Sequence, residues 1–275
     1  MPELPEVETV RQTLKKIVLG KKIKNVIINY QRIIQNSDSD TFIKSLIGRT
    51  IIDINRLGKY MYFCFENITY LISHLRMEGK YFIKDSSLEI DKHEHIIFQF
   101  EDGSDLRYHD VRKFGTMELK NEDNLLTTHP LSDLGVEANR LDGKYLFMKM
   151  NNKNQPLKTF LLDQSNVAGI GNIYADEICF KARLHPLLNV KKITLEECEK
   201  IAEASNEIIN KAILAGGSTI RSYTSSLNVT GLFQLQLLVH TKKGEACCMC
   251  NNTIIKCVVG GRGTYLCPNC QKLEK

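Results

Sequence analysis

The first residues of the chain carry an amine and a carboxylate that could do covalent chemistry. The chain begins Met1-Pro2-Glu3, and the small residue after Met1 favours removal of the methionine. Removal would leave the secondary amine of Pro2 beside the carboxylate of Glu3. A terminal amine has a pKa of about 8, so roughly a tenth of it is unprotonated at neutral pH. The sequence therefore presents Pro2 as a candidate nucleophile and Glu3 as a candidate acid or base.

A secondary amine would give a distinctive intermediate. Its adduct at an electrophilic carbon is an iminium ion that cannot lose its charge by deprotonation, so it persists as an electron sink and can drive elimination. The competing interpretation is that these residues only lead into a helix. Val7, Val10, Leu14 and Ile17 recur at helical spacing, and Gly20 offers a helix end. The N-terminal motif by itself leaves both interpretations open.

The cysteines provide a second, more specific pattern. Cys247 and Cys250 have two residues between them, as do Cys267 and Cys270, and sixteen residues separate the pairs. This spacing is typical of a closed tetrahedral zinc site of four thiolates. Cys248 and Cys257 do not fit it and are expected to be spare. The remaining cysteines are interpreted as small buried hydrophobic residues: Cys64, Cys179 and Cys198.

The tip of the segment between the two cysteine pairs, residues 258–264, is rich in glycine and carries one cation, Arg262. A flexible tip with a single positive charge suits close approach to a phosphate or a DNA groove. Many zinc ribbons have similar tips and bind only protein. The spacing therefore predicts the metal, while the partner of the tip stays open.

Composition places few limits on function. The chain has 275 residues, of which 43% are hydrophobic and 25% charged, and its net charge is +5. Such a charge suits a polyanionic partner but does not identify one. No apolar run approaches the ~20 residues that cross a bilayer. The first residues do not resemble a secretory signal, so we expect a cytoplasmic protein.

The elements that must position these residues fall into three regions. Residues 1–135 are expected to form a β-rich domain with strands at 23–30, 60–65, 69–75 and 96–100, a helix at 41–47, and a hairpin turn at Asp102-Gly103. Residues 145–240 are expected to be helical. Helices are predicted at 157–166 and 173–182, and a longer one begins at Thr194, which forms a capping box with Glu197, and ends near Gly216-Gly217. Residues 241–275 form the zinc-binding tail.

Six segments, taken in order, resemble one known family. They are PELPEVETV at the N-terminus, Gly58-Lys59-Tyr60, HLRMEG at 74–79, DVRKFG at 110–115, LDQSNVAGIGNIYADE at 162–177, and the cysteine-rich tail. Together they cover nearly the whole chain and resemble bacterial formamidopyrimidine-DNA glycosylase, the 8-oxoguanine enzyme.

The resemblance implies a multidomain α+β fold. Its parts would be a catalytic β-sandwich with flanking helices, a helix–two-turns–helix domain and a zinc-finger β-hairpin, with DNA in the cleft between the two main domains. It implies a bifunctional glycosylase and abasic-site lyase of base-excision repair, which excises 8-oxoguanine and formamidopyrimidines through a Schiff base and cleaves the strand by β,δ-elimination. The implied cofactor is one structural zinc ion, and the implied partner is duplex DNA containing a damaged base. We expect a monomer without membrane association, located at the nucleoid.

The resemblance also assigns roles to individual residues of this chain. Pro2 corresponds to the nucleophile, Glu3 to the proton donor and Glu6 to a supporting acid. Lys59 and Arg262 correspond to proton donors of the two elimination steps and to phosphate contacts. The remaining expected DNA contacts are His74, Met77, Arg112, Phe114, Lys158 and Asn172, and the expected lesion loop is Ser218, Thr219, Ile220, Arg221, Ser222 and Tyr223.

Met77, Arg112 and Phe114 match the family residues that fill the vacated base stack once the damaged nucleotide is flipped out. The alternative interpretation is that Met77 and Phe114 are core residues, which is the usual location of such side chains. Polar and glycine neighbours favour loops instead.

The chain departs from the family pattern before the first cysteine pair. The family usually has Tyr-Gly-Arg where this chain has His240-Thr241-Lys242. The tyrosine contact to phosphate is therefore lost or replaced by His240.

Two alternatives to the purine enzyme remain open. One is a glycosylase of the endonuclease VIII type, which prefers oxidised pyrimidines, and the segment at 217–223 argues against it. The other is a zinc-finger protein that binds damaged DNA without catalysis.

Overall fold

The computed structural model describes residues 1–218 and 231–273. The chain divides into two compact units. The first unit comprises Met1–Ser132 and Ser218–Gly231, and the second comprises Asp133–Gly217 and Leu232–Lys275.

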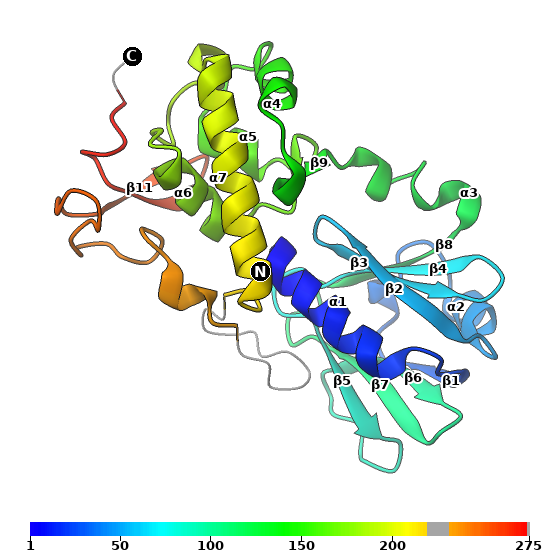
Figure 1. Cartoon of the computed structure of the whole chain (residues 1–275). Coiled ribbons are helices and arrows are strands. Elements are labelled where there is room, and N and C mark those ends of the chain that lie inside the picture. Colours follow the sequence, from blue (N-terminus) through cyan, green and yellow to red (C-terminus); the bar gives the residue numbers. More distant parts are fainter. Residues whose placement is uncertain (219–230, 274–275) are drawn as a thin grey trace. The chain divides into compact units, whose positions relative to one another are not determined.

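The first unit contains two antiparallel sheets of four strands each (Figure 1). One sheet has the order β1-β6-β7-β5, with β1 at Ile23–Ile28, β6 at Glu94–Phe100, β7 at Ser104–His109 and β5 at Lys80–Asp85. The other has the order β2-β3-β4-β8, with β2 at Ile51–Leu57, β3 at Tyr60–Phe65, β4 at Thr69–His74 and β8 at Thr116–Asn121. The helices are α1 at Leu4–Val18, α2 at Ser39–Leu46 and α3 at Glu122–Leu125.

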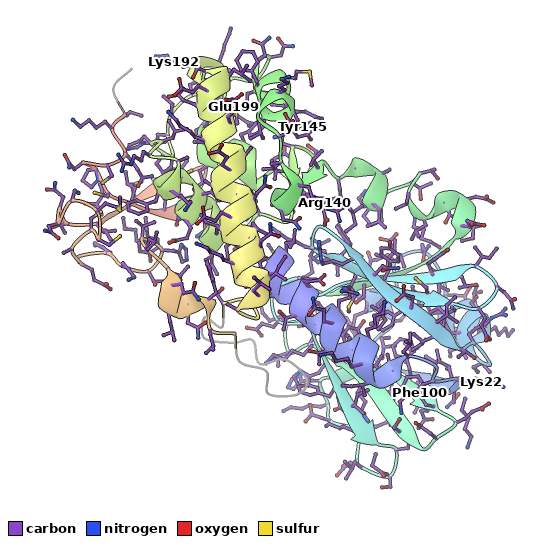
Figure 2. The ribbon with its side chains drawn as sticks, viewed as in Figure 1. Lys22, Phe100, Arg140, Tyr145, Lys192 and Glu199 are labelled. Carbon is purple, nitrogen blue, oxygen red and sulfur yellow. The ribbon has the colours of Figure 1, made fainter. Side chains whose placement is uncertain are left out.

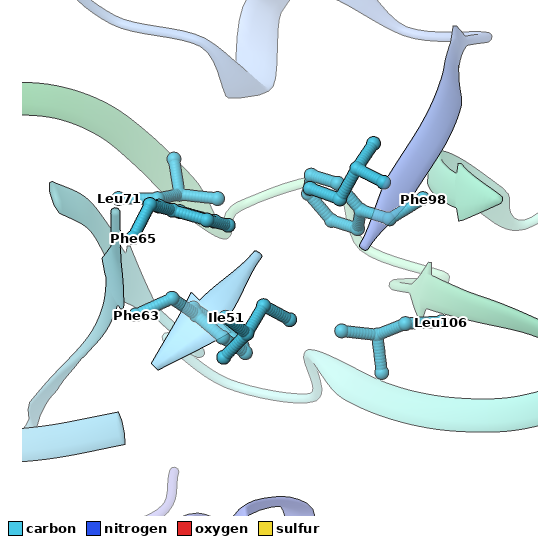
Figure 3. Close-up of a pocket in the computed structure, with 7 residues that line it drawn as sticks. Ile51, Phe63, Phe65, Leu71, Phe98 and Leu106 are labelled. Atoms are coloured by element: carbon cyan, nitrogen blue, oxygen red, sulfur yellow. The ribbon is translucent and has the colours of Figure 1, made fainter. Parts of the chain in front are cut away.

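The two sheets pack face to face around one apolar core. Figure 3 shows Ile51, Phe63 and Leu71 of one sheet across a small apolar gap from Phe98 and Leu106 of the other. Alternating burial along the strands, such as over residues 60–63 of β3, supplies inward side chains such as Phe63. Figure 2 labels Phe100 and Lys22 at one end of this unit, where Ile23 pairs with Phe100. The predicted β-sandwich is confirmed.

Helix α1 packs against β2 and β3 through the residues that the helical spacing singled out. Val7, Val10 and Leu14 are all buried in the core of the first unit. Pro5 lies in the first turn, where its missing N–H has no partner to lose. The helix expected at 41–47 instead begins at Ser39, because the Asp38 side chain accepts a hydrogen bond from the Thr41 N–H and caps it.

The second unit contains four further α-helices, within its described residues, and the cysteine-rich segment that begins at Thr241. Its helices are α4 at Gly143–Met150, α5 at Leu157–Leu162, α6 at Asn172–Lys181 and α7 at Leu195–Leu214. Short strands β9 at Val136–Glu137 and β10 at Val167–Ala168 pair in parallel, and β11 at Ile255–Val259 forms a hairpin with β12 at Arg262–Leu266. In the part of the chain that the structure describes, no helix is long and apolar enough to cross a membrane.

Two sequence expectations about these helices had different outcomes. Thr194 and Glu197 form the predicted capping box at the start of α7. The predicted helix at 157–166 was too long, because the Asp163 side chain accepts the Ser165 N–H and turns the chain after Leu162. Figure 2 labels Tyr145 and Glu199, which belong to the neighbouring helices α4 and α7. These helices approach closely, since a Cβ at Gly143 would lie 2.6 Å from the Glu199 side chain.

The cysteine-rich segment packs on helix α6. Phe180 of α6 shares a small core with Val239, Ile254 and the buried cysteines Cys247 and Cys267. The Gln271 side chain donates to the Leu184 carbonyl, which ties the end of the segment to the chain that follows α6. A segment this small builds little core of its own, so it depends on this contact and on its cysteine cluster.

Thr241 carries backbone strain that a glycine would relieve. The Lys242 N–H donates to the Val239 carbonyl, and Thr241 at the third position of this turn has φ +69°. A type II turn normally has glycine there, because a β-branched residue in the left-handed region is strained. We predict that Thr241→Gly raises the free energy of unfolding by about 0.5–1 kcal/mol, measured by urea unfolding.

The control is Thr253→Gly, which changes another exposed threonine of the cysteine-rich segment. Thr253 lies outside the left-handed region and pairs with Ala246 in an isolated bridge, so glycine there relieves no strain and adds freedom to the unfolded chain. It should lower the free energy of unfolding by about 0.5–1 kcal/mol. Equal losses in both variants would contradict the strain at Thr241.

Candidate active site and DNA-contacting residues

Pro2 and Glu3 are both buried at the start of helix α1. Glu3 is only 2% exposed and precedes the first helical residue. Its backbone N–H donates to Glu6 Oε2 at 2.8 Å. The positive end of the helix dipole favours carboxylates at this place. The helix start therefore fixes the backbone of Glu3 next to the candidate nucleophile.

Glu6 also binds a segment more than two hundred residues away. Its second oxygen, Oε1, accepts the Ser218 N–H at 2.7 Å and the Ser218 hydroxyl at 3.2 Å. Glu6 is 6% exposed, so these bonds lie away from water. One carboxylate thus joins the start of α1 to the first residue of the expected lesion loop. The other residues of that loop, Thr219, Ile220, Arg221, Ser222 and Tyr223, lie outside the described residues.

Lys59 lies in the two-residue turn between β2 and β3 and is 5% exposed. The turn is anchored to α1 by an arginine that sequence reasoning did not identify. Arg56 donates from Nε to Glu8 Oε2 at 3.0 Å and from Nη1 to the Gly58 carbonyl at 2.9 Å. Gly58 has φ +57°, which suits this tight turn. Arg56 and Glu8 therefore position the turn that carries Lys59.

Glu8 remains ionised although it is largely buried. Burial raises its pKa, but hydrogen bonds from Arg11, Gln12 and Arg56 outweigh burial and hold the pKa below its usual value. The arginine at i+3 was visible in the sequence, whereas Arg56 is 48 residues away and could be found only in the folded chain.

His74 is the last residue of β4 and pairs with Tyr60, the residue after Lys59. It is 7% exposed. Burial, with the positive charges of Arg76 and Lys59, lowers its pKa to about 3. Its Nδ1 accepts the Arg76 N–H at 3.0 Å, so the single ring proton resides on Nε2. His74 is therefore neutral at physiological pH, and its Nε2–H is a donor of the kind that a phosphate oxygen accepts.

Met77 and Phe114 lie on two adjacent loops of the first unit. One loop connects β4 to β5 and the other connects β7 to β8. The loops lie at the same ends of their strands, because His74 pairs with Thr116 and Lys80 pairs with His109. Met77 is 38% exposed and Phe114 is 52% exposed. Neither side chain belongs to the core, so the alternative that Met77 and Phe114 are core residues is excluded.

The second of these loops is organised by Asp110, which is fully buried. Its carboxylate accepts the backbone N–H groups of Arg112, Phe114 and Gly115, each at 2.9 Å. The Arg112 guanidinium lies 4.8 Å from the centroid of the Phe114 ring. Asp110 was not among the sequence-predicted site residues, although it opens the DVRKFG motif. It holds Arg112 and Phe114 on one outward loop.

Asn172 begins helix α6 in the second unit, after the glycine-rich turn. Its side-chain amide donates to the Gly263 carbonyl at 3.0 Å, next to Arg262 in the hairpin of β11 and β12. Gln164 shapes the turn by accepting the Gly169 N–H and donating to the Ile170 carbonyl. The structure thus brings Asn172 close to the hairpin that carries Arg262, which is exposed.

Lys158 is fully buried, although the resemblance gave it as a DNA contact, which requires an accessible side chain. Its ammonium group donates to Asp176 Oδ1 at 2.7 Å, to Thr264 Oγ1 at 2.9 Å and to the Gly263 carbonyl at 3.0 Å. All three of its donors are used. A contact between Lys158 and DNA would require this network to open, so the geometry gives Lys158 the position of an internal tie between α5, α6 and the hairpin.

His240, at the position where the family has tyrosine, joins the same network. Its Nδ1 lies 2.7 Å from Asp176 Oδ2, and the ring is 7% exposed. Asp176 Oδ2 also accepts the Tyr265 N–H. The His240 ring therefore points at the buried Asp176 carboxylate. The same carboxylate attaches the hairpin of β11 and β12 to helix α6.

The four predicted cysteines lie together. The sulfur atoms of Cys247, Cys250, Cys267 and Cys270 are all within 4.8 Å of one another. Two of the separations are 3.9 Å and 3.4 Å. Four thiolates around one ion with metal–sulfur bonds of about 2.3 Å would be about 3.8 Å apart. The cluster can hold a tetrahedral metal ion, and Cys248 is exposed outside it.

The depressed pKa of His74 predicts a specific acid sensitivity. The unfolded chain binds a proton at His74 below a pH of about 6.5, whereas the folded chain does not until about pH 3. His74 therefore lowers the free energy of unfolding as the pH falls through this window, by up to about 1.4 kcal/mol per pH unit. In His74→Gln this contribution is absent.

The measurement is urea unfolding of both proteins at several pH values, without DNA. The difference in stability between the parent and His74→Gln should be constant above about pH 7.5 and should shift in favour of the variant on acidification to about pH 5. A difference that does not change with pH would show that His74 titrates normally.

Comparisons with known proteins agree over the full length of the chain. The model of the formamidopyrimidine-DNA glycosylase N-terminal domain matches residues 1–117, and the model of its H2TH domain matches residues 134–224. A formamidopyrimidine-DNA glycosylase of Bacillus cereus is 45% identical, with 98% of this chain and 99% of the relative covered. One of Listeria innocua is 44% identical, with 99% of this chain and 100% of the relative covered.

Solved structures give the same result. A mutant of the Lactococcus lactis Fpg in complex with DNA that contains Fapy-dG matches with a TM-score of 0.93 and 40% identity, covering 98% of this chain and 100% of that chain. The Lactococcus lactis Fpg with DNA that contains an abasic site matches with a TM-score of 0.92 and 40% identity, covering 98% and 99%. With the sandwich, the helical unit and the four-cysteine hairpin all in place, the chain belongs to the formamidopyrimidine-DNA glycosylase family.

Proposed function

We propose that this protein excises oxidised purines from duplex DNA and then cleaves the strand at the resulting abasic site, in base-excision repair. The observation that carries the chemistry is the buried pair Pro2 and Glu3 at the start of α1, with the turn of Lys59 tied to the same helix through Arg56 and Glu8. The solved Fpg complexes of Lactococcus lactis with Fapy-dG and abasic DNA support this substrate class.

The proposed reaction begins after Met1 is removed. The Pro2 nitrogen forms a bond to C1′ of the damaged nucleotide, the bond from C1′ to the base breaks, and Glu3 protonates the opening sugar ring. The product is an iminium ion between Pro2 and C1′. Loss of a C2′ proton expels the 3′ phosphate and a second elimination expels the 5′ phosphate, with Lys59 and Arg262 as the proposed proton donors.

DNA would be held by groups of both units. The neutral His74 donates from Nε2, and Asn172 and Arg262 are the proposed phosphate contacts of the second unit. Met77, Arg112 and Phe114 would fill the vacated base stack. Lys158 is proposed to support Asn172 and the hairpin from inside, because its ammonium group is buried in the network with Asp176. Such a substrate would place the protein at the nucleoid.

The metal is proposed to be one structural Zn²⁺ ion held by Cys247, Cys250, Cys267 and Cys270. The closed set of four thiolates leaves no open position for a substrate, so the ion would supply folding energy and no chemistry. We predict one zinc per chain by elemental analysis. Removal with a chelator should weaken DNA binding by at least about tenfold, because structural zinc contributes directly to folding, and should lower the melting temperature.

Cys248→Ser is the matched control, since its thiol is exposed and outside the cluster. It should bind zinc and DNA as the parent does, whereas Cys250→Ser should lose the metal. Retention of full zinc by Cys250→Ser would contradict the proposed ligands.

Borohydride trapping on a duplex with 8-oxoguanine opposite cytosine tests the nucleophile. Protein with a free Pro2 amine should give a covalent adduct with DNA, because borohydride reduces the iminium ion. Protein with one extra N-terminal residue should bind the duplex and give no adduct.

Two results would require another function, and a third would require another nucleophile. Absence of an adduct from correctly processed protein that binds the duplex would favour the non-catalytic DNA-binding protein. A clear preference for thymine glycol over 8-oxoguanine would favour the pyrimidine enzyme. An equal adduct from the extended protein would exclude Pro2 as nucleophile.

A further inference from the structure

Tyr108 lies at the base of both loops that carry the proposed DNA-inserting residues. It is the residue before the end of β7 and is fully buried. Its ring contacts the edge of Tyr81, with centroids 5.2 Å apart. Its hydroxyl oxygen is 3.5 Å from Asp110 Oδ2, the carboxylate that organises the loop of Arg112 and Phe114. The Tyr108 side chain therefore ends where the two loops begin.

The backbones of both loops touch this hydroxyl group. A Cβ at Gly79, which closes the loop of Met77, would lie 2.3 Å from Tyr108 Oη. A Cβ at Gly115, which closes the loop of Phe114, would lie 1.6 Å from the same atom. Neither glycine is in the left-handed region of φ. Glycine is needed at Gly115 because Tyr108 occupies the space, and at Gly79 because Tyr108 and the Leu75 carbonyl, 2.7 Å from such a Cβ, both occupy it.

Each loop also contains a residue held in a strained conformation. Arg76 has φ +51° and Lys113 has φ +58°. Strained residues persist only where the surrounding structure fixes them. Asp110 fixes the second loop through backbone N–H groups, and the Leu75 carbonyl accepts the Gly79 N–H in the first. The Tyr108 hydroxyl group is a contact that the two loops share.

We propose that Tyr108 is a positioning residue that sets the spacing between Met77 and Phe114 as they enter the DNA. The proposal rests on the proposed function, since it requires that these side chains fill the vacated stack. Stacked bases are about 3.4 Å apart, so small shifts of either loop would misplace a wedge. Removal of the hydroxyl group leaves space into which Gly79 or Gly115 can move. The two loops can then shift relative to one another, and the distance between Met77 and Phe114 changes.

The test compares Tyr108→Phe with Tyr81→Phe and Phe114→Ala. Tyr81 is a matched control, because it is 1% exposed, belongs to the same aromatic cluster and also loses a buried hydroxyl group, whose partner is Ser73 Oγ at 2.7 Å. The first readout is the fluorescence of 2-aminopurine placed beside 8-oxoguanine, which reports local unstacking. The second is single-turnover excision of 8-oxoguanine, and the third is cleavage of a preformed abasic site. Melting temperatures are measured for all variants.

Tyr108→Phe should slow unstacking and excision by about tenfold, less than the roughly hundredfold expected for misplacement of a reacting group by 1 Å. Cleavage of the abasic site should stay within about twofold, because no damaged base has to be extruded there. Tyr81→Phe should match the parent in all three assays.

Normal unstacking and excision by Tyr108→Phe, beside a defect in Phe114→Ala, would overturn the role of Tyr108 and leave the proposed function intact. Equal defects in Tyr108→Phe and Tyr81→Phe, or an equal loss of excision and abasic-site cleavage, would also overturn it, because both indicate general damage to the unit. Normal unstacking by Phe114→Ala would instead reject the wedge role itself and with it the inference.

Discussion

Buried carboxylates are the constraint on which the arrangement of this protein depends. A carboxylate removed from water is costly unless donors surround it. Glu6, Glu8, Asp110, Asp176 and Glu177 are each at most 9% exposed. Each finds its donors on a segment that must therefore be held in place. Burial raises the pKa of Glu177, against the opposing effect of its hydrogen bonds. Its carboxylate accepts the N–H groups of residues 238, 239 and 240, and these bonds fix the chain that leads to Cys247.

In the first unit this constraint organises the site around helix α1. Glu6 connects the Glu3 backbone to Ser218, and Glu8 connects the helix to the turn of Lys59 through Arg56. The residues proposed to react thus lie on elements that share one helix as their support. Positions held by packing and charged hydrogen bonds on regular elements are more exact than positions on loops. This arrangement gives a physical reason why an N-terminus, usually a poorly ordered part of a chain, can carry chemistry.

In the second unit the same constraint ties the hairpin of β11 and β12 to the helices. Asp176 accepts from Lys158 and from the Tyr265 N–H and lies against His240, so the hairpin with Arg262 cannot move independently of α6 without exposing a charge. Breaking one partner of such a network would strand a buried ion. The replacement of the family tyrosine by His240 is therefore a change inside this network, and the adjoining Thr241 retains the turn with a strained φ.

The family, the four-cysteine cluster and part of the secondary structure of this protein could be predicted from its sequence. Cysteine spacing predicted the four-cysteine cluster, and the motif order predicted the family. Helical periodicity predicted α1, and β-branched and aromatic residues predicted β1, β3, β4 and β6, in each case to within a few residues. These are local signals, because spacing along the chain directly sets geometry within one element. The sequence did not reveal Arg56, Asp110 or Tyr108 as site residues, nor that Lys158 is internal. Their roles depend on contacts between segments far apart in the chain, such as the 48 residues between Glu8 and Arg56. Burial and pairing decide whether a charge binds a ligand or supports the fold, and only the tertiary structure determines both.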